Sequence, residues 1–233
     1  CNTLCFSRRR NKINFDYKLS GHVLLQALDQ HKYLGVTLSS NMKWNAHIDK
    51  AVSKASSMIG FLRRNLGNAP EKVKIQAYKS LVRPHVEYCS SVWDPHTKRY
   101  IQKVETVQRR AARFITNDYG RESSVTNMLT NLELPSLQQR RLNNRLTMMH
   151  KIVHNKVDLS FEKHLQFDVP DPSTVKTRNH NPLTLKVPST KTDCFQKTFF
   201  PNTARDWNAL PYLITSIEDT ASFNRAISSE QLD

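Results

Sequence analysis

The chain of 233 residues is long enough for one large domain or two modest ones, and its 38% content of hydrophobic residues suffices for a core. It contains no uninterrupted apolar run of about 18 residues, which argues against a transmembrane helix. Only 5 residues are glycine, a composition that argues against glycine-rich phosphate loops and repeated tight hairpins.

The net charge of +15 is distributed unevenly. Residues 1–151 hold 26 Lys and Arg against 10 Asp and Glu, whereas residues 152–233 hold 9 against 10. A basic excess concentrated in this way favours a polyanionic partner, most often a nucleic acid. The alternative is that these residues are solvated charges on the outer faces of ordinary helices.

The cysteine spacing indicates the redox compartment of the chain, and its first residues indicate whether it is a fragment. Four widely spaced cysteines form neither a CxxC pair nor a cluster with His at zinc-finger spacing, which indicates reduced, intracellular thiols. The sequence begins at Cys1, without an initiator Met or a charged-then-apolar leader. We interpret it as a fragment whose start lies upstream.

We predict a mainly α fold with a small N-terminal antiparallel β-meander (α+β). Short strands are expected at residues 3–7, 12–17 and 32–38, and three strands of this length need a covering layer. The predicted regions are 1–41 with the strands, 42–154 with basic helices, and 155–233 with a proline-containing linker and an aromatic-rich end.

A change from period 2 to period 3.6 predicts the first helix over residues 43–66, with N-cap candidates at residues 39–41 and Gly67 as its C-terminal cap. A second helix is predicted from Pro70-Glu71 to Leu81, with Val73, Ala77, Tyr78 and Leu81 facing inward, and Pro84 starts or kinks the next.

The helix predicted over residues 98–116 separates its residues by type around its axis. At 100° per residue, the apolar residues from Ile101 to Ile115 fall on one arc and the basic residues on the other. The apolar arc should be buried, and the arc of Arg99, Lys103, Arg110 and Arg113 should be exposed. Like charges at this density destabilise a helix, so binding of a phosphate-rich partner would relieve the repulsion.

Two more helices are predicted, a short one at Val125, Met128 and Leu129, and one that begins after Ser136 and runs to about His154. Four prolines in residues 155–194 exclude a long helix there, so we expect an extended segment on the helices or a partly disordered linker, with a short strand at residues 183–187. The apolar density near the C-terminus indicates docking onto the helical core.

Residue chemistry alone indicates no active site. The pair Glu218-Asp219 precedes a predicted helix start, where acids complement the helix dipole rather than bind metal. His150 and His154 have zinc-compatible spacing but no third ligand. Cys89 follows His85 by four residues, yet a buried structural cysteine is the better interpretation.

Five sets of residues resemble the reverse transcriptases of non-LTR (LINE-type, jockey/CR1-like) retrotransposons, in order across nearly all of the chain. They are KYLGV at 32–36 with WNAHI at 44–48, LVRPHVEY at 81–88 with VW at 92–93, VETVQRRAARFI at 104–115, Leu134/Leu137/Arg140/Arg141, and WNALP at 207–211. Each block alone is weak, and the ordered set is specific.

The resemblance implies a C-terminal fragment of an RNA-directed DNA polymerase: the last palm strands, a helical thumb-like body and its extension. The family's metal-binding aspartates lie in an FADD-type box that this sequence lacks, so Mg²⁺ belongs to the intact parent enzyme, and the fragment alone is expected to be inactive and to have no cofactor. The implied partners are RNA and DNA as template–primer, and the upstream palm and fingers. The implied location is nuclear and cytoplasmic.

The predicted nucleic-acid contacts combine the resemblance with the basic helices. They are Tyr33, Gly35, Arg99, Lys103, Arg109, Arg110, Arg113, Arg140 and Arg141. Two alternatives stay open: a stand-alone, non-catalytic nucleic-acid-binding protein derived from such an element, and a helical scaffold for protein interactions whose basic face is only solvated.

Overall fold

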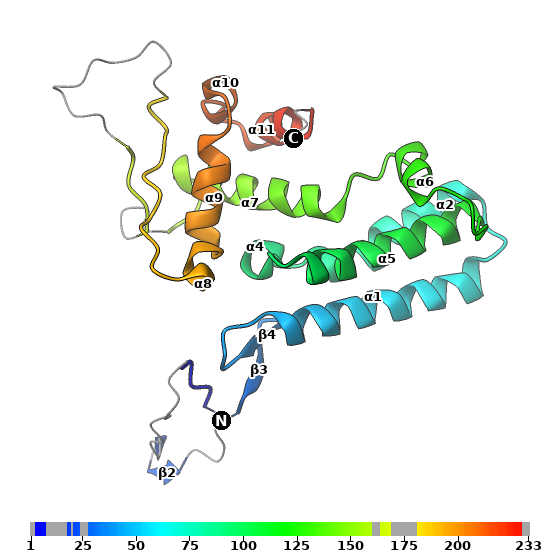
Figure 1. The fold of residues 1–233 in the computed structure, drawn as a ribbon, viewed down its shortest axis with the longest axis horizontal. Helices are drawn as coiled ribbons and strands as arrows, with labels where there is room; N and C mark the ends of the chain where they lie inside the picture. The colour runs from blue at the N-terminus through cyan, green and yellow to red at the C-terminus, as the bar shows by residue number, and fades with distance from the viewer. Residues whose placement is uncertain are drawn as a thin grey trace. The chain divides into compact units, whose positions relative to one another are not determined.

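The computed structural model describes residues 3–7, 18–19, 21–23, 28–159, 164–168 and 181–229 (Figure 1). The described residues are mainly helical, with two short antiparallel hairpins near the N-terminus, which confirms the predicted fold class. The chain divides into two compact units. Unit 1 comprises residues 1–89 and 95–135, and unit 2 comprises residues 90–94 and 136–233.

The β-structure of unit 1 consists of β1 (Lys18–Leu19) with β2 (His22–Val23), and β3 (Gln30–Tyr33) with β4 (Val36–Ser39). The single strand predicted at 32–38 is wrong, because the chain turns at Leu34 and Gly35, where φ is +45° and +85°. Two consecutive positive φ angles are those of a two-residue hairpin turn. Residues 3–7 contain one bridge residue rather than a strand, and 12–17 lie outside the described residues.

Helix α1 (Asn45–Leu66) confirms the first predicted helix, and Ile48, Ala55, Ile59 and Leu62 lie buried on one face. Its N-cap is Trp44 and not one of the predicted polar residues 39–41, because Ser39 is already part of β4. Gly67 takes the C-cap position in a right-handed conformation.

The second predicted helix runs on through Pro84 as α2 (Glu71–Ala77), the π-helical turn η1 (Tyr78–Val82) and α3 (Arg83–Glu87). Proline lacks an N–H and clashes with the carbonyl four residues earlier in a regular helix, and a wider turn accommodates it. The π turn also shifts the buried face. Val82 is fully buried and Leu81 is 45% exposed, opposite to the prediction for Leu81.

Val73 was also predicted to face inward, and it is exposed, because the neighbouring Lys74 takes the buried position. The Lys74 ammonium lies 5.4 Å from the centre of the Phe114 ring, so the alkyl chain is buried while the charge meets an aromatic face. Tyr78, one turn further on, is fully buried as predicted.

Helices α5 (Lys98–Thr116) and α6 (Val125–Asn131) complete unit 1 and confirm their predicted positions. Helices α1 and α5 lie side by side and run in the same direction (Figure 1). Helix α2, which lies between them in the sequence, packs against α5. In the buried interface, Tyr78 donates a hydrogen bond of 2.7 Å to Gln108, whose amide donates to the Pro135 carbonyl at 2.9 Å.

Unit 2 begins with α4 (Ser90–Trp93), which packs on α7 (Leu137–Val153). Asp94 joins them. Its carboxylate lies 2.8 Å from Arg141 Nε and 3.0 Å from Arg145 Nε, and Arg145 Nη2 lies 2.9 Å from Asp206. Arg141 is fully buried, so removal of its partner would leave an uncompensated charge inside the unit.

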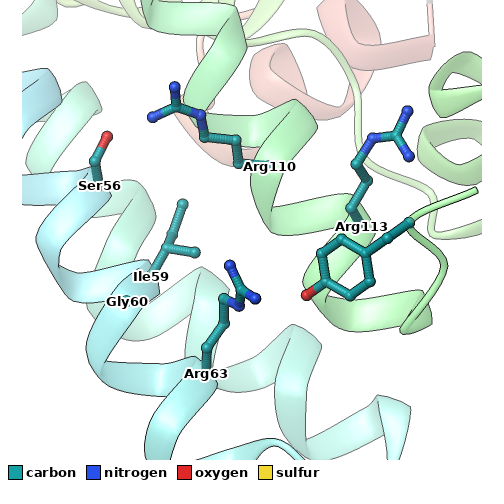
Figure 2. Close-up of a pocket in the computed structure, with 7 residues that line it drawn as sticks. Ser56, Ile59, Gly60, Arg63, Arg110 and Arg113 are labelled. Atoms are coloured by element: carbon teal, nitrogen blue, oxygen red, sulfur yellow. The ribbon is translucent and has the colours of Figure 1, made fainter. Parts of the chain in front are cut away.

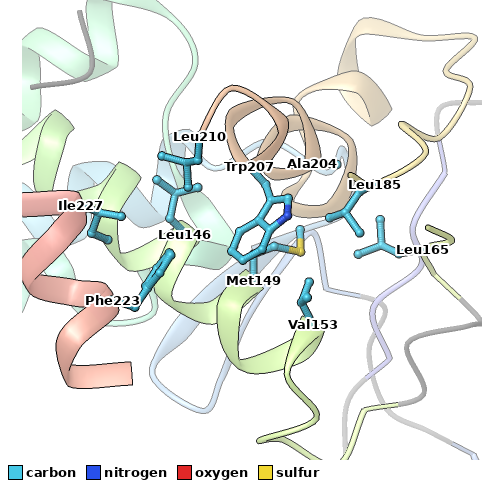
Figure 3. Packing of buried hydrophobic residues seen from close by; sticks show 10 residues of the cluster. All are labelled: Leu146, Met149, Val153, Leu165, Leu185, Ala204, Trp207, Leu210, Phe223 and Ile227. Carbon is cyan, nitrogen blue, oxygen red and sulfur yellow. The ribbon is translucent and has the colours of Figure 1, made fainter. Parts of the chain in front are cut away.

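The C-terminal segment packs on α7 through α9 (Phe199–Asn208) and α11 (Thr220–Ser229). Helix α8 (Asp193–Gln196) contacts α9, and α10 (Tyr212–Thr215) contacts α11. Figure 3 shows Trp207 in the middle of this core, which also contains Leu146, Met149, Leu165, Leu185 and Phe223. Docking of the tail is therefore confirmed. The compact units do not follow the predicted regions, because α7 belongs with the tail.

The segment at residues 183–187 was predicted as a strand, and it contains one bridge, from Leu185 to Phe167. Side chains of α9 supply further hydrogen bonds to this segment. Trp207 donates to the Leu183 carbonyl at 2.9 Å, and the Asn208 amide pairs with both backbone groups of Leu185 at 2.9 and 2.8 Å. Asn208 thus replaces a neighbouring strand.

We predict that Asp94→Ala destabilises unit 2 by about 3 kcal/mol, because it leaves the buried Arg141 charge without its partner. Urea unfolding followed by tryptophan fluorescence measures the change, since Trp93 and Trp207 both lie buried in unit 2. The exposed Asp158 is the control, and Asp158→Ala should leave the unfolding midpoint unchanged. Equal midpoints for the two variants would contradict the prediction.

Candidate nucleic-acid interface

The two faces of α5 are separated as predicted. Val104, Val107, Ala111 and Ala112 are buried, with at most 1% exposure, whereas the basic residues Arg99, Lys103, Arg109 and Arg110 are exposed. Arg113 differs from the prediction. It is half-buried because its Nη1 donates a hydrogen bond of 3.0 Å to the Gly120 carbonyl.

Lys103 forms an ion pair with Asp49 of α1, with 2.5 Å between Nζ and Oδ1. Both side chains are more than 40% exposed, and ion pairs in that setting contribute only about 0–1 kcal/mol. A phosphate can therefore compete with Asp49 for the Lys103 ammonium.

An arginine-lined hollow lies between α1 and α5, with a volume of about 350 Å³ (Figure 2). Arg110 and Arg113 come from α5, whereas α1 supplies Arg63 and the small residues Ser56 and Gly60, which leave room for the hollow. Ile59 and Tyr119 complete the lining, which contains no carboxylate. We refer to this feature as the arginine hollow.

The loop after α5 holds Tyr119 at the edge of the arginine hollow. The chain leaves α5 through Asn117, whose φ is +53°, and Asp118 Oδ1 then accepts hydrogen bonds from Gly120 N at 2.9 Å and Ser123 Oγ at 2.7 Å. The Ser123 and Gly120 hydrogen bonds lower the pKa of Asp118. The hydrogen bond from Gly120 N to Asp118 Oδ1 closes a turn around Tyr119.

Gly120 is required in this loop for steric reasons. A Cβ atom there would lie 2.6 Å from Ser123 Oγ and 3.2 Å from Asp118 Oδ1. The loop also brings Tyr119 to Arg63, whose Cζ lies 5.2 Å from the centre of the phenol ring. This distance is typical of a cation–π contact, which stabilises the orientation of both the Tyr119 ring and the Arg63 guanidinium.

Tyr33 and Gly35, predicted as nucleic-acid contacts, lie at the turn between β3 and β4. Tyr33 is 60% exposed, while Gly35 approaches Tyr88 so closely that a Cβ would lie 2.9 Å from a ring carbon. The Tyr88 hydroxyl donates a hydrogen bond of 3.0 Å to the Leu34 carbonyl. Gly35 therefore has a packing role, and Tyr33 remains a predicted contact.

The two predicted contacts on α7 have different surroundings. Arg140 is half-buried, whereas Arg141 has no exposed surface and pairs with Asp94. A fully buried guanidinium cannot reach a phosphate, so Arg141 is removed from the predicted set. The sequence pattern placed it on a charged face because a partner 47 residues away in the chain leaves no local signal.

The structure assigns other roles to the histidines and acids that were considered for metal binding. His150 Nε2 and His154 Nε2 lie 2.7 and 3.0 Å from the carbonyls of Ile217 and Thr215, so each ring donates to a backbone oxygen. Asp219 accepts from Ser222 N at 2.7 Å at the start of α11, as its predicted dipole role requires. Within the described residues, no group of three or more His, Cys, Asp or Glu could hold a metal ion.

The remaining nucleophile candidate, Cys89, is half-buried and its φ is +52°. The prediction of a buried cysteine is wrong, because Cys89 lies in the turn after α3, where its neighbour Tyr88 is 55% exposed. Like Cys5 and Cys194, it is a free thiol.

Sequence reasoning missed the contribution of α1 to the site. Ser56, Gly60 and Arg63 lie at spacings of four and three, so they share one stripe of the helix. This stripe of small residues beside the apolar face was the available signal. Tyr119 had no such signal, because its position depends on the fold of the loop.

Comparison with known proteins gave no match of this chain to a protein-family model, a curated protein or a solved structure. None of the helices in the described part of the chain combines the length and the hydropathy needed to cross a bilayer.

We predict that acidification destabilises unit 2 through His150. Burial lowers the pKa of His150 from its ordinary value of 6.5, with smaller contributions from His154 and Lys156 in the same direction. The unfolded chain then binds more protons than the folded one below pH 6.5, so the free energy of unfolding is highest above pH 6.5 and falls on acidification. Urea midpoints measured across this window test the sign.

The control for this prediction is His150→Gln, which keeps a donor for the Ile217 carbonyl but does not titrate. Its midpoint should depend less on pH than that of the unchanged chain, whereas replacement of the exposed His96 by Gln should have no effect. An unchanged pH dependence in His150→Gln would refute the assignment.

Proposed function

We propose that unit 1 binds the sugar–phosphate backbone of a nucleic acid through the basic face of α5. The observation that carries this proposal is the exposure of Arg99, Lys103, Arg109 and Arg110 on a helix whose opposite face is fully buried. Burial of that face keeps the basic side of α5 directed at solvent, where a partner can reach it.

The length of the basic face suits a strand of nucleic acid. Arg99 and Arg110 are eleven residues apart, which at 1.5 Å per residue places them about 16 Å apart along the axis of α5. One strand of a duplex carries a phosphate per about 3.4 Å of axis, so about five phosphates lie within this length. Charge contacts of this kind hold and position a strand without reading its sequence.

We further propose that the chain is the primer–template-holding part of a non-LTR retrotransposon reverse transcriptase. The five ordered sets of residues that resemble that family support this, and so does a mainly helical body with a short hairpin before it. In this proposal the chain holds template and primer, and the metal-dependent step belongs to residues of the parent polypeptide outside it.

The test is the double change Arg99→Ala/Arg109→Ala, which removes two exposed charges outside the arginine hollow. Affinity for a short, blunt RNA–DNA hybrid, measured by fluorescence anisotropy across a salt series, should fall about tenfold or more. The slope of log affinity against log salt should become less steep by about two, because about one counterion is released per phosphate contact.

The matched control is Lys43→Ala/Lys72→Ala, which removes the same charge from exposed positions of unit 1 that are not part of α5. It should change the affinity little. Equal affinities and salt slopes for the two double variants would show that the basic face is only solvated, as the scaffold alternative holds.

A further inference from the structure

The arginine hollow is more than a continuation of the basic face, because it combines three cations from two helices with a half-exposed aromatic ring. Arg63 and Arg110 are exposed, Arg113 is half-buried, and Tyr119 is 49% exposed beside them. A site that binds phosphate alone requires only the cations, so the ring indicates a ligand that has a flat apolar part as well as a negative charge.

Two of the three arginines are already held by contacts within unit 1, which favours binding of a phosphate group. One N–H of Arg113 is used by the Gly120 carbonyl, which leaves the rest of its planar fork for another acceptor. Arg63 is held against the Tyr119 ring at 5.2 Å. Guanidinium groups that are already oriented lose less freedom on binding a phosphate, and they bind it with two parallel hydrogen bonds.

Asp118 attracts Arg113, but one carboxylate does not neutralise the three arginines of the hollow. Its Oδ1 accepts two hydrogen bonds from its own loop, and it is outside the lining of the hollow. Arg63, Arg110 and Arg113 around one hollow therefore form a local excess of positive charge that an anion would relieve.

The size of the hollow suits one nucleotide. A volume of about 350 Å³ lies at the lower end of small-molecule sites and is too small for the width of a duplex. Unpaired bases, in contrast, commonly stack on tyrosine rings while the backbone follows basic side chains. Ile59 provides an apolar floor, and Ser56 and Gly60 leave space above it.

Resting on the proposed nucleic-acid binding, we infer that the arginine hollow holds an unpaired nucleotide adjoining the bound duplex. Its phosphate lies among Arg63, Arg110 and Arg113, and its base stacks on Tyr119. A phosphorylated peptide would also satisfy the arginines. The aromatic ring and the basic face of α5 beside the hollow favour a nucleic acid instead.

The experiment compares a blunt RNA–DNA hybrid with the same hybrid carrying a short single-stranded overhang, using the full chain. For the unchanged protein the overhang should raise the affinity about tenfold, the effect of one base stacked on an aromatic ring. Tyr119→Phe keeps the ring and should keep this gain. Tyr119→Ala should remove the gain while leaving the affinity for the blunt hybrid unchanged.

Arg110→Ala provides a second variant, since Arg110 is exposed and makes no contribution to the core. It should also reduce the gain from the overhang. The inference is overturned if Tyr119→Ala keeps the whole gain, if the unchanged protein shows no gain, or if a phosphoserine peptide displaces the overhang more strongly than a mononucleotide does.

These outcomes are separable from failure of the proposed function. The proposed function depends on how the blunt hybrid responds to Arg99→Ala/Arg109→Ala, whereas the present inference depends on the ratio of overhang to blunt affinities. Loss of the ratio alone leaves a duplex-binding face without a nucleotide site.

Discussion

The buried hydrogen bonds of Gln108 set the direction in which every arginine of α5 points. Gln108 lies in the apolar face of α5 with no exposed surface, where it accepts from Tyr78 and donates to the Pro135 carbonyl. An apolar face alone tolerates small rotations of a helix, whereas a buried amide loses its partners if the helix turns. The rotation of α5, and with it the basic face and one wall of the arginine hollow, depends on this residue.

Most residues that carry the family resemblance have packing roles. Gly35 closes against Tyr88, His47 accepts from the Thr37 backbone at 3.2 Å, and Asn208 pairs with Leu185. Trp93 is fully buried as well. Such residues specify how a chain folds, so the resemblance bears most directly on the fold, while the functional proposal depends on the exposed arginines among them.

The sequence alone predicted the structure correctly where the burial of a residue depends only on its position around one helix. The period of 3.6 residues predicted α1, α5 and α7 almost to their ends, and the basic arc of α5 with them. The sequence alone failed where a residue far away in the chain determines the conformation or the burial. The hairpin turn at Leu34 interrupts a run that looks like one strand, and Arg141 is buried because Asp94, far away in the chain, neutralises it. Tyr119 belongs to the same class, since only the folded loop brings it to Arg63.

Arginines thus have opposite roles in the two units, and the placement of carboxylates explains the difference. In unit 2, Asp94 and Asp206 lie among the guanidinium groups of α7, which makes burial of Arg141 and Arg145 tolerable. Burial raises the pKa of Asp206, against the attraction of Arg145. On α5 the ion pair to Asp49 engages Lys103 alone among the exposed basic residues that the structure describes there. The arginines of α5 therefore still repel one another. The packing of the opposite face must offset this repulsion, and a bound phosphate backbone would remove it.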